Sequence, residues 1–236
     1  MKVGIVVFPG SNCDRDVLHV FQNVLEVETI MLWHKDAELK NFNNEDLIVL
    51  PGGFSYGDYL RTGAIAKFSP IMNSIQKFAV EGGMVIGICN GFQILCEAGM
   101  LPGVLLQNNN QKYVCKNVHI RVENSNTQLT NSISHLEVLK IPIAHGDGRY
   151  FADSNTLSEL QSNDQILFRY CSDKGITDDN FNPNGSIDNI AGICNKTKNV
   201  FGMMPHPERA SESILGNADG LKLFSSLLKQ VHEKSI

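Results

Sequence analysis

The chain has 236 residues, enough for one large domain with a sizeable hydrophobic core. Apolar residues make up 42% and charged residues 19%, which is typical of a soluble globular protein. The net charge of −5, without any Lys/Arg cluster, disfavours nucleic-acid binding, and no apolar run approaches the roughly 20 residues of a membrane span.

The cysteines and the amino-terminal residues indicate a reducing compartment. The six cysteines are scattered and form no Cys-x-x-Cys pair, and a chain of this size needs no disulfides to fold. The chain begins directly with a strand-like run and not with a signal peptide. We therefore expect reduced thiols and a cytoplasmic protein.

The first predicted elements are a strand over residues 2–8 and a helix over about 14–24. The strand is a β-branched apolar run, typical of a central parallel strand. Ser11 or Asn12 is expected to cap the helix through its side-chain oxygen. Cys13, at the start of this helix, is a rival candidate for a nucleophile, although it lacks flanking glycines.

Strands are then predicted over residues 26–32 and 47–50, and the second of them ends in a glycine-rich loop over 51–64. Loops at the carboxyl ends of parallel strands commonly bind ligands. The backbone N–H groups around Gly52 and Gly53 could therefore form an oxyanion hole. A phosphate loop is an alternative, although Gly-Lys-Ser/Thr is lacking, and a structural turn is another.

The next stretch predicts a nucleophile elbow. A helix over 70–81, capped by Ser69, precedes an apolar strand over 84–88 and helix-forming residues over 92–98. Between them stands Gly87-Ile-Cys89-Asn-Gly91, in which glycines allow a tight, strained turn that leaves the side chain of Cys89 exposed. The amino end of the following helix favours the thiolate. A structural core cysteine is the alternative.

After residue 103 the pattern becomes more strand-rich. Strands over 113–122, 136–143 and 165–170, and a hairpin over 189–203, surround a short helix over 155–163, and a packing helix over 219–231 closes the chain. The glycine-rich loop over 144–150 contains His145, which either binds a substrate or bonds to the backbone. The alternation over residues 1–100 predicts an α/β fold with a mostly parallel sheet flanked by helices and a small antiparallel extension, in one domain over 1–236.

Pro205-His206-Pro207-Glu208 supplies the remaining groups of a triad. Two prolines hold His206 on a rigid backbone, and Glu208 can reach back to the imidazole on a strand-like backbone, where positions i and i+2 share a side. A histidine so held can take the proton of the Cys89 thiol, and a carboxylate can fix its tautomer. A metal-binding pair is an alternative without a third ligand nearby in the chain, and a surface loop is another.

Three motifs stand in one order: Pro-Gly-Gly, Gly-x-Cys-x-Gly-x-Gln and Pro-His-Pro-Glu. Together they resemble the class I glutamine amidotransferases, whose domain has a flavodoxin-like fold. The resemblance implies that Cys89 attacks the amide of L-glutamine, with His206 and Glu208 as partners, and yields a glutamyl thioester and ammonia. It also implies an oxyanion hole at Gly53 and Asn90 and a role for Gln93 in holding glutamine. Gly52 and His145 are further candidate substrate-binding residues, and no metal is expected.

Five segments resemble, more narrowly, the glutaminase subunits of phosphoribosylformylglycinamidine synthase; they begin at Phe8, Gly52, Ile88, Ala144 and Met203. Gly-Phe-Ser-Tyr-Gly-Asp is their sharpest discriminator. The resemblance implies a large synthetase subunit with ATP and magnesium, a small third subunit and no cofactor on this chain. That enzyme converts formylglycinamide ribonucleotide to formylglycinamidine ribonucleotide in purine biosynthesis. Departures from the family pattern are Tyr113 and Cys115-Lys116, where the family often has Phe and Cys-Arg; the Asn of that pattern stands at 108.

Two other functions remain open from the sequence. A stand-alone cysteine hydrolase could cut another γ-glutamyl bond in a pocket that accepts a longer leaving group. A non-catalytic relative of the same fold would not need the intact Cys89, His206 and Glu208. For the leading hypothesis we expect the isolated chain to be nearly inactive, because the Gly53 peptide turns into an oxyanion hole only with the partner.

Overall fold

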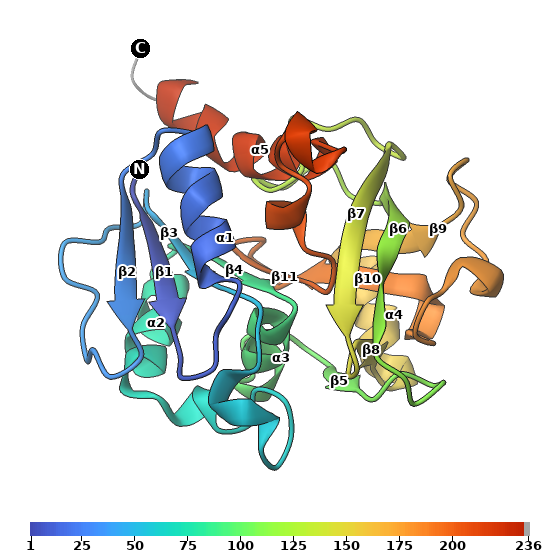
Figure 1. The fold of residues 1–236 in the computed structure, drawn as a ribbon, viewed down its shortest axis with the longest axis horizontal. Helices are drawn as coiled ribbons and strands as arrows, with labels where there is room; N and C mark the ends of the chain where they lie inside the picture. Colours follow the sequence, from blue (N-terminus) through green and yellow to red (C-terminus); the bar gives the residue numbers. More distant parts are fainter. Residues whose placement is uncertain (234–236) are drawn as a thin grey trace.

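The structure is a computed structural model that describes residues 1–233, with side chains through residue 228. Within these residues one nine-stranded sheet runs through the molecule, with helices on both faces (Figure 1). Its strand order is β2-β1-β3-β4-β11-β10-β9-β6-β7. The strands of this sheet are β1 (Val3–Val7), β2 (Thr29–Trp33), β3 (Leu47–Leu50), β4 (Met84–Ile88), β6 (Val114–Val122), β7 (Val138–His145), β9 (Ile166–Cys171), β10 (Ile190–Cys194) and β11 (Val200–Met203).

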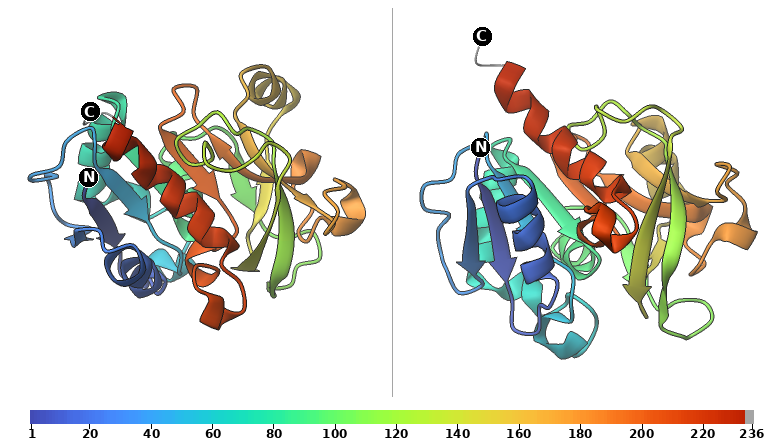
Figure 2. Two further views of the ribbon diagram at one scale, coloured as in Figure 1. Left: turned by 90° about the horizontal axis from the view of Figure 1, so that it is seen from above. Right: turned by 45° about the horizontal axis from the view of Figure 1, so that its top comes forward.

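The helices lie in two layers. On one face are α1 and α5, and on the other are α2, α3 and α4 (Figures 1 and 2). In the described part of the chain, no helix is long and apolar enough to cross a membrane. The helix bounds are α1 (Asp14–His19), which continues as a π-helical turn (Val20–Val24), α2 (Pro70–Val80), α3 (Asn90–Glu97), α4 (Ser154–Ser162) and α5 (Asp219–Glu233).

The amino-terminal half of the sheet is parallel. β1 pairs with β2 and β3, and β4 pairs with β3 and β11, all in parallel. β3 and β4 are buried along their whole length, which explains why their sequences are continuous apolar runs and do not alternate with polar residues. This half confirms the predicted α/β fold class.

The second half of the sheet is the antiparallel extension. β11 pairs with β10 in an antiparallel hairpin, and β9, β6 and β7 continue that pattern outward. A short separate pair, β5 (Val104–Leu106) with β8 (Arg149–Phe151), was not predicted. The single domain over 1–236 stays a prediction, and residues 234–236 lie outside the described part of the chain.

The predicted cap of the first helix is wrong, whereas Ser69 stands at the predicted capping position of α2 but makes no capping hydrogen bond. The residue that caps α1 by position is Cys13, and its side chain makes no capping bond. The Ser11 hydroxyl accepts a hydrogen bond from the backbone N–H three residues earlier, and Asn12 accepts the thiol hydrogen of Cys13. Ser69 does precede α2, but its hydroxyl bonds with the Tyr56 hydroxyl at 2.9 Å.

Candidate active site

The turn between β4 and α3 forces Cys89 into a strained backbone conformation, with φ +50° and ψ −104°. Glycine is required on both sides of it. A Cβ added at Gly91 would lie 1.9 Å from the carbonyl oxygen of Leu50, and one at Gly87 would lie 2.5 Å from the oxygen of Gly91. The predicted steric reason for the Gly-x-Cys-x-Gly spacing is therefore confirmed. The thiol stands at the amino end of α3.

The expectation that the Cys89 side chain is exposed is wrong, since only 5% of the residue is accessible. The carbonyl oxygen of Ala144 lies 3.7 Å from its sulfur, and the side chain of Tyr113 lines the same small cavity. This cavity has a volume of about 40 Å³, which is room for about three water molecules. The Cys89 thiol is therefore almost completely shielded from solvent, in part by Tyr113 and Ala144.

His206 reaches the elbow because β11 is the direct neighbour of β4. Met203 pairs with Ile88 in the parallel register, so the residues that follow the two strands meet at the same edge of the sheet. The Nδ1 atom of His206 lies 2.6 Å from an oxygen of Glu208, and both side chains are buried. The backbone reason given for this contact is wrong: Pro207–Arg209 is a turn of 3-10 helix and not a strand.

The charges around His206 favour the imidazolium. Burial opposes the charged ring, but the carboxylate of Glu208 and the thiols of Cys89 and Cys13 outweigh this effect and raise the pKa of His206 well above its usual value. Among the described residues, Nε2 of His206 and one carboxylate oxygen of Glu208 have no hydrogen-bond partner. The ring is therefore ready to hold a proton and has a free nitrogen.

Cys13, the rival nucleophile, lies at the same histidine. Its sulfur accepts a hydrogen bond of 3.1 Å from the guanidinium of Arg209, and it lines the same cavity as Cys89. Burial raises the pKa of the Cys13 thiol, and its backbone is not strained. The strained elbow favours Cys89 as the nucleophile. Arg209 was missed from the sequence, although it directly follows the Pro-His-Pro-Glu motif.

Backbone contacts hold the Gly52–Gly53 loop against the segment after β1. The N–H of Cys13 donates to the Gly52 carbonyl at 3.3 Å, and the N–H of Phe54 donates to the carbonyl of Gly10 at 3.0 Å. Gly53 has φ +137°, and a Cβ there would lie 2.7 Å from the backbone nitrogen of Asn12. Only glycine fits this close approach, and Gly53 lines the cavity beside Cys89.

Asn90 and Gln93 form a hydrogen-bonded pair on the first turn of α3. The Asn90 amide donates to the Gln93 oxygen at 2.9 Å, and the Gln93 amide donates to the Asp147 carbonyl at 2.7 Å. The carboxylate of Asp58 lies beside this pair, and burial together with the charge of Asp147 raises its pKa to about 6. The sequence analysis assigned no role to Asp58 or Asp147. Asp58 stands in the motif Ser-Tyr-Gly-Asp, and Asp147 stands in His-Gly-Asp.

His145 is buried and does not line the cavity beside Cys89. Its Nδ1 lies 3.1 Å from the side-chain oxygen of Asn108, which also accepts the N–H of Gly148. Burial lowers the pKa of His145 to about 4, so the ring is neutral at neutral pH. These contacts favour the alternative in which His145 bonds to its own loop, and they give Asn108 the task of holding that loop.

No third potential metal ligand was expected near His206 and Glu208, but the fold brings one close to them. Cys13, far away in the chain, brings its sulfur close, and the potential ligand atoms of Cys13, His206 and Glu208 all lie within 4.8 Å of one another. Proximity of this kind cannot be seen from residue spacing. The absence of a metal stays a prediction.

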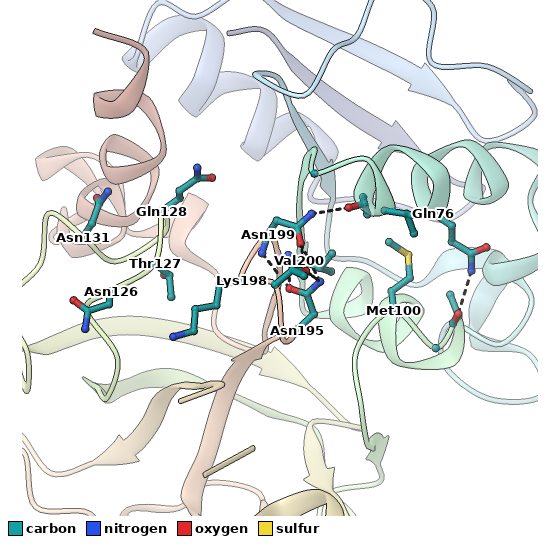
Figure 3. Close-up of a pocket in the computed structure, with 16 residues that line it drawn as sticks. Gln76, Met100, Asn126, Thr127, Gln128, Asn131, Asn195, Lys198, Asn199 and Val200 are labelled. Carbon is teal, nitrogen blue, oxygen red and sulfur yellow. Dashed lines mark hydrogen bonds between the residues drawn. The ribbon is translucent and has the colours of Figure 1, made fainter. Parts of the chain in front are cut away.

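A larger cavity, of about 930 Å³, lies at the opposite end of the sheet, where β4 and β11 begin (Figure 3). Its polar side chains bond within the protein: the Gln76 amide donates to the Ala98 carbonyl, and the Asn199 amide donates to two carbonyls at the end of α2. Lys198 is the one ionisable residue among those that line it. The cavity therefore offers no nucleophile or base, and we place the chemistry at Cys89.

The comparisons with known proteins agree with this geometry. A family model described as a CobB/CobQ-like glutamine amidotransferase domain matches residues 1–223. Phosphoribosylformylglycinamidine synthase subunit PurQ of Koribacter versatilis is 55% identical over 97% of each chain, and that of Salinibacter ruber is 51% identical over 98% of this chain and 97% of its own.

Solved structures give the same result. The chain superposes on one from the structure of PurLQS from Thermotoga maritima with a TM-score of 0.83 and 44% identity over 98% of both chains. A glutamine amidotransferase from Thermotoga maritima, at 14% identity and a TM-score of 0.55 over 100% of this chain and 86% of its own, shares the fold. The chain therefore belongs to the class I glutamine amidotransferases and, within them, to the family of PurQ subunits of phosphoribosylformylglycinamidine synthase.

Proposed function

We propose that the chain is the glutaminase subunit of a phosphoribosylformylglycinamidine synthase. It hydrolyses L-glutamine to glutamate and ammonia and passes the ammonia to a synthetase subunit, which converts formylglycinamide ribonucleotide to formylglycinamidine ribonucleotide in purine biosynthesis. The observation that carries this proposal is the meeting of strained Cys89 with the buried His206–Glu208 pair at neighbouring strand ends. More than half of the residues are identical to PurQ subunits along nearly the whole chain.

The first half of the reaction forms a thioester. His206 takes the proton of the Cys89 thiol, the thiolate attacks the side-chain amide carbon of glutamine, and a tetrahedral intermediate forms. His206 then returns the proton to the amide nitrogen, which leaves as ammonia. Glu208, 2.6 Å from Nδ1, holds the tautomer that leaves Nε2 for this proton transfer.

The backbone N–H groups of Gly53 and Asn90 stabilise the oxyanion of the intermediate. Removing one such donor from a serine protease costs about 3–4 kcal/mol of transition-state stabilisation. Gln93 helps to hold the substrate, and its present bonds to Asn90 and Asp147 must rearrange for that contact. In the second half, His206 activates water, which attacks the thioester carbon and releases glutamate from Cys89.

The remaining assignments concern partners and place. The large synthetase subunit holds ATP and magnesium, a small third subunit completes the enzyme, and this chain carries no cofactor. The relative in Thermotoga maritima is a chain of a structure named PurLQS, which supports a complex of this kind. A cytoplasmic location accords with six free cysteines, and neither a nucleic acid nor a membrane is a partner.

A stand-alone hydrolase of longer γ-glutamyl substrates is the weaker candidate. The identity of more than half of the residues to PurQ subunits, along nearly the whole chain, favours the glutaminase subunit instead. The 14%-identical neighbour supports only the fold. We therefore keep one function.

The decisive experiment measures ammonia release from L-glutamine by the chain alone and by the chain with its synthetase subunits, ATP and formylglycinamide ribonucleotide. We expect strong release only in the complete mixture, and a fall of at least about 1,000-fold in Cys89→Ala. Cys115→Ala, which removes an exposed thiol, is the matched control. Full activity of Cys89→Ala would exclude the proposed nucleophile, and release that ignores the partners would favour an independent hydrolase.

A further inference from the structure

The loop after β3 contains a serine and an aspartate, Ser55 and Asp58, to which the mechanism above gives no role. Between them, Tyr56 fixes the loop through its hydroxyl, which bonds with Nδ1 of His34 at 2.7 Å and with the Ser69 hydroxyl at 2.9 Å. The loop is therefore held firmly at its centre, and its two remaining polar side chains are available for another task.

Both residues lie against the side chain of Asn90, on the first turn of α3. The N–H of Ser55 donates to the Asn90 oxygen at 3.1 Å, and the Asn90 amide nitrogen lies 3.4 Å from a carboxylate oxygen of Asp58. The same amide donates to the oxygen of Gln93, the residue that we assign to holding the substrate. Asp58 therefore stands next to the proposed glutamine contacts.

The charge and hydrogen-bonding capacity of this corner are not satisfied within the protein. The charged neighbour that affects the Asp58 carboxyl is Asp147, another acid, and together with burial it raises the pKa of Asp58 to about 6. Independently, the hydroxyl of Ser55 has no hydrogen-bond partner among the described residues, although only 2% of this residue is exposed. Buried polar atoms are nearly always paired, so both observations indicate a ligand group with positive charge and N–H donors.

The dimensions of glutamine match this place. Four covalent bonds separate its amide carbon, which Cys89 attacks, from its α-ammonium nitrogen, a reach of about 5 Å. From Cys89 to Gln93 the helix α3 rises by about 6 Å. A glutamine whose amide carbon lies at the thiol can therefore bring its ammonium group to the first turn of α3. Asp58 and Asp147 belong to no group of three potential metal ligands in the described part of the chain, which favours an organic cation.

We propose that Asp58 binds the α-ammonium group of L-glutamine, with the Ser55 hydroxyl as a second acceptor, and thereby selects an amino-acid amide over a simple amide. This inference rests on the proposed function, because it concerns the same substrate. The ammonium group supplies the positive charge that the corner lacks, and the nearby Asp147 carboxylate adds to the attraction. The loop between Gly53 and Asp58 then serves both ends of the substrate, the oxyanion at Gly53 and the ammonium group at Asp58.

Titration calorimetry on the complete enzyme tests this, with Cys89→Ala in this chain so that ligands bind without turnover. The two ligands are L-glutamine and glutaramate, which is glutamine without its α-ammonium group. We expect L-glutamine to bind at least about 10-fold more tightly, because glutaramate lacks the charged hydrogen bond. Adding Asp58→Asn should remove this difference by weakening L-glutamine alone, whereas Asp173→Asn, at an exposed aspartate, should keep it.

Glutaramate also controls for folding, because a chain with Asp58→Asn that binds it as before has an intact site. A preference for L-glutamine that survives Asp58→Asn, or an equal loss for both ligands, would overturn the assignment. Turnover by the complete enzyme with Cys89 in place separates this inference from the proposed function. No ammonia release from L-glutamine would refute the function itself, whereas release combined with an unchanged preference in Asp58→Asn would refute only the role of Asp58.

Discussion

At the scale of single residues, the proposed activation of the Cys89 thiol depends on the buried pair of His206 and Glu208. The two side chains lie 2.6 Å apart, and both are almost completely shielded from bulk water. The carboxylate outweighs the effect of burial and raises the pKa of His206. The charge of Glu208, and not merely its shape, is therefore what stabilises the imidazolium formed during attack.

Glu208→Gln tests this. The amide keeps the size of the side chain and loses the charge, so we expect kcat to fall by about 100- to 10,000-fold while KM changes little. Steady-state ammonia release by the complete enzyme measures both constants. Glu212→Gln, at a partly exposed glutamate whose bond is to His19, is the matched control. Equal losses in the two variants would show that the effect is not specific to the triad.

Asp58 gives a pH-dependent prediction. Burial and the nearby Asp147 raise its pKa from 3.8 to about 6. The folded chain therefore holds this proton more tightly than the unfolded chain, so stability falls as the pH rises from about 4 to 6 and the penalty is complete above that range. Asp58→Asn should raise the free energy of unfolding at pH 8 by about 1 kcal/mol, a value discounted for partial exposure, and by much less at pH 4.

Urea unfolding at the two pH values measures this difference. The comparison between pH values matters because Asp58 has a positive φ of 55°, a conformation that asparagine also tolerates well, and that backbone effect does not change with pH. Asp173→Asn, at an exposed aspartate, should show no change at either pH. A stabilisation by Asp58→Asn that is equal at pH 4 and pH 8 would contradict the charge explanation.

At the scale of elements, the elbow depends on contact between α3 and β3. A Cβ on Gly91 would lie 1.9 Å from the Leu50 oxygen, so Gly91→Ala must push the first turn of α3 away from the sheet. We expect a loss of about 3 kcal/mol or more in the free energy of unfolding, measured by chemical denaturation. Gly146→Ala, where the added atom would lie 3.8 Å from Tyr113, should be much milder. A small effect at Gly91 would mean that the turn can relax.

Elements whose signal is local were predictable from the sequence. β1, β3 and β4 are short buried strands with continuous apolar runs, and the elbow between β4 and α3 has a steric rule that leaves few alternatives to glycine. The proposed nucleophile Cys89 and the His206–Glu208 pair could be singled out because each stands in a short motif. These features depend on neighbours in the chain, which the sequence displays directly.

Features that depend on distant partners were not predictable. Ser69 has the right residue type for a cap, yet a tyrosine thirteen positions earlier takes its hydroxyl. The short pair of β5 with β8 joins segments that carry weak strand signals of their own. The approach of Cys13 to His206 depends on the order of β1, β3, β4 and β11 in the sheet, and the spacing of residues does not contain that order.

At the scale of the whole molecule, the site is closed. The cavity beside Cys89 has room for about three water molecules, whereas glutamine has ten non-hydrogen atoms. Loops from both halves of the sheet form its walls, since Gly53 follows β3 and Ala144 lies on β7. A shift of one half's loops relative to the other would open or close it, which gives a partner subunit a means of control.

We therefore expect a glutamine-like electrophile to label Cys89 slowly in the isolated chain and at least 10-fold faster in the complex with its synthetase subunits and their substrates. Intact-mass measurement over time gives the two rates, and Cys89→Ala shows that the label is on this residue. Equal rates would contradict control by the partner and would leave the triad itself unaffected.

The hydrogen-bonded pair of β4 and β11 carries one wall of the site. The N–H of Cys89 donates to the Met203 carbonyl at 2.8 Å, so the nucleophile and the segment that carries the histidine hang from adjacent rungs of one hydrogen-bonded backbone. The opposite wall includes Gly53, which follows β3, and Ala144, near the end of β7. The side chains of Gln93 and Asn108 hold the loop that follows β7. Substitutions at Gln93 or Asn108 could thus change access to the thiol, while the β4–β11 ladder keeps the spacing between Cys89 and the His206 segment.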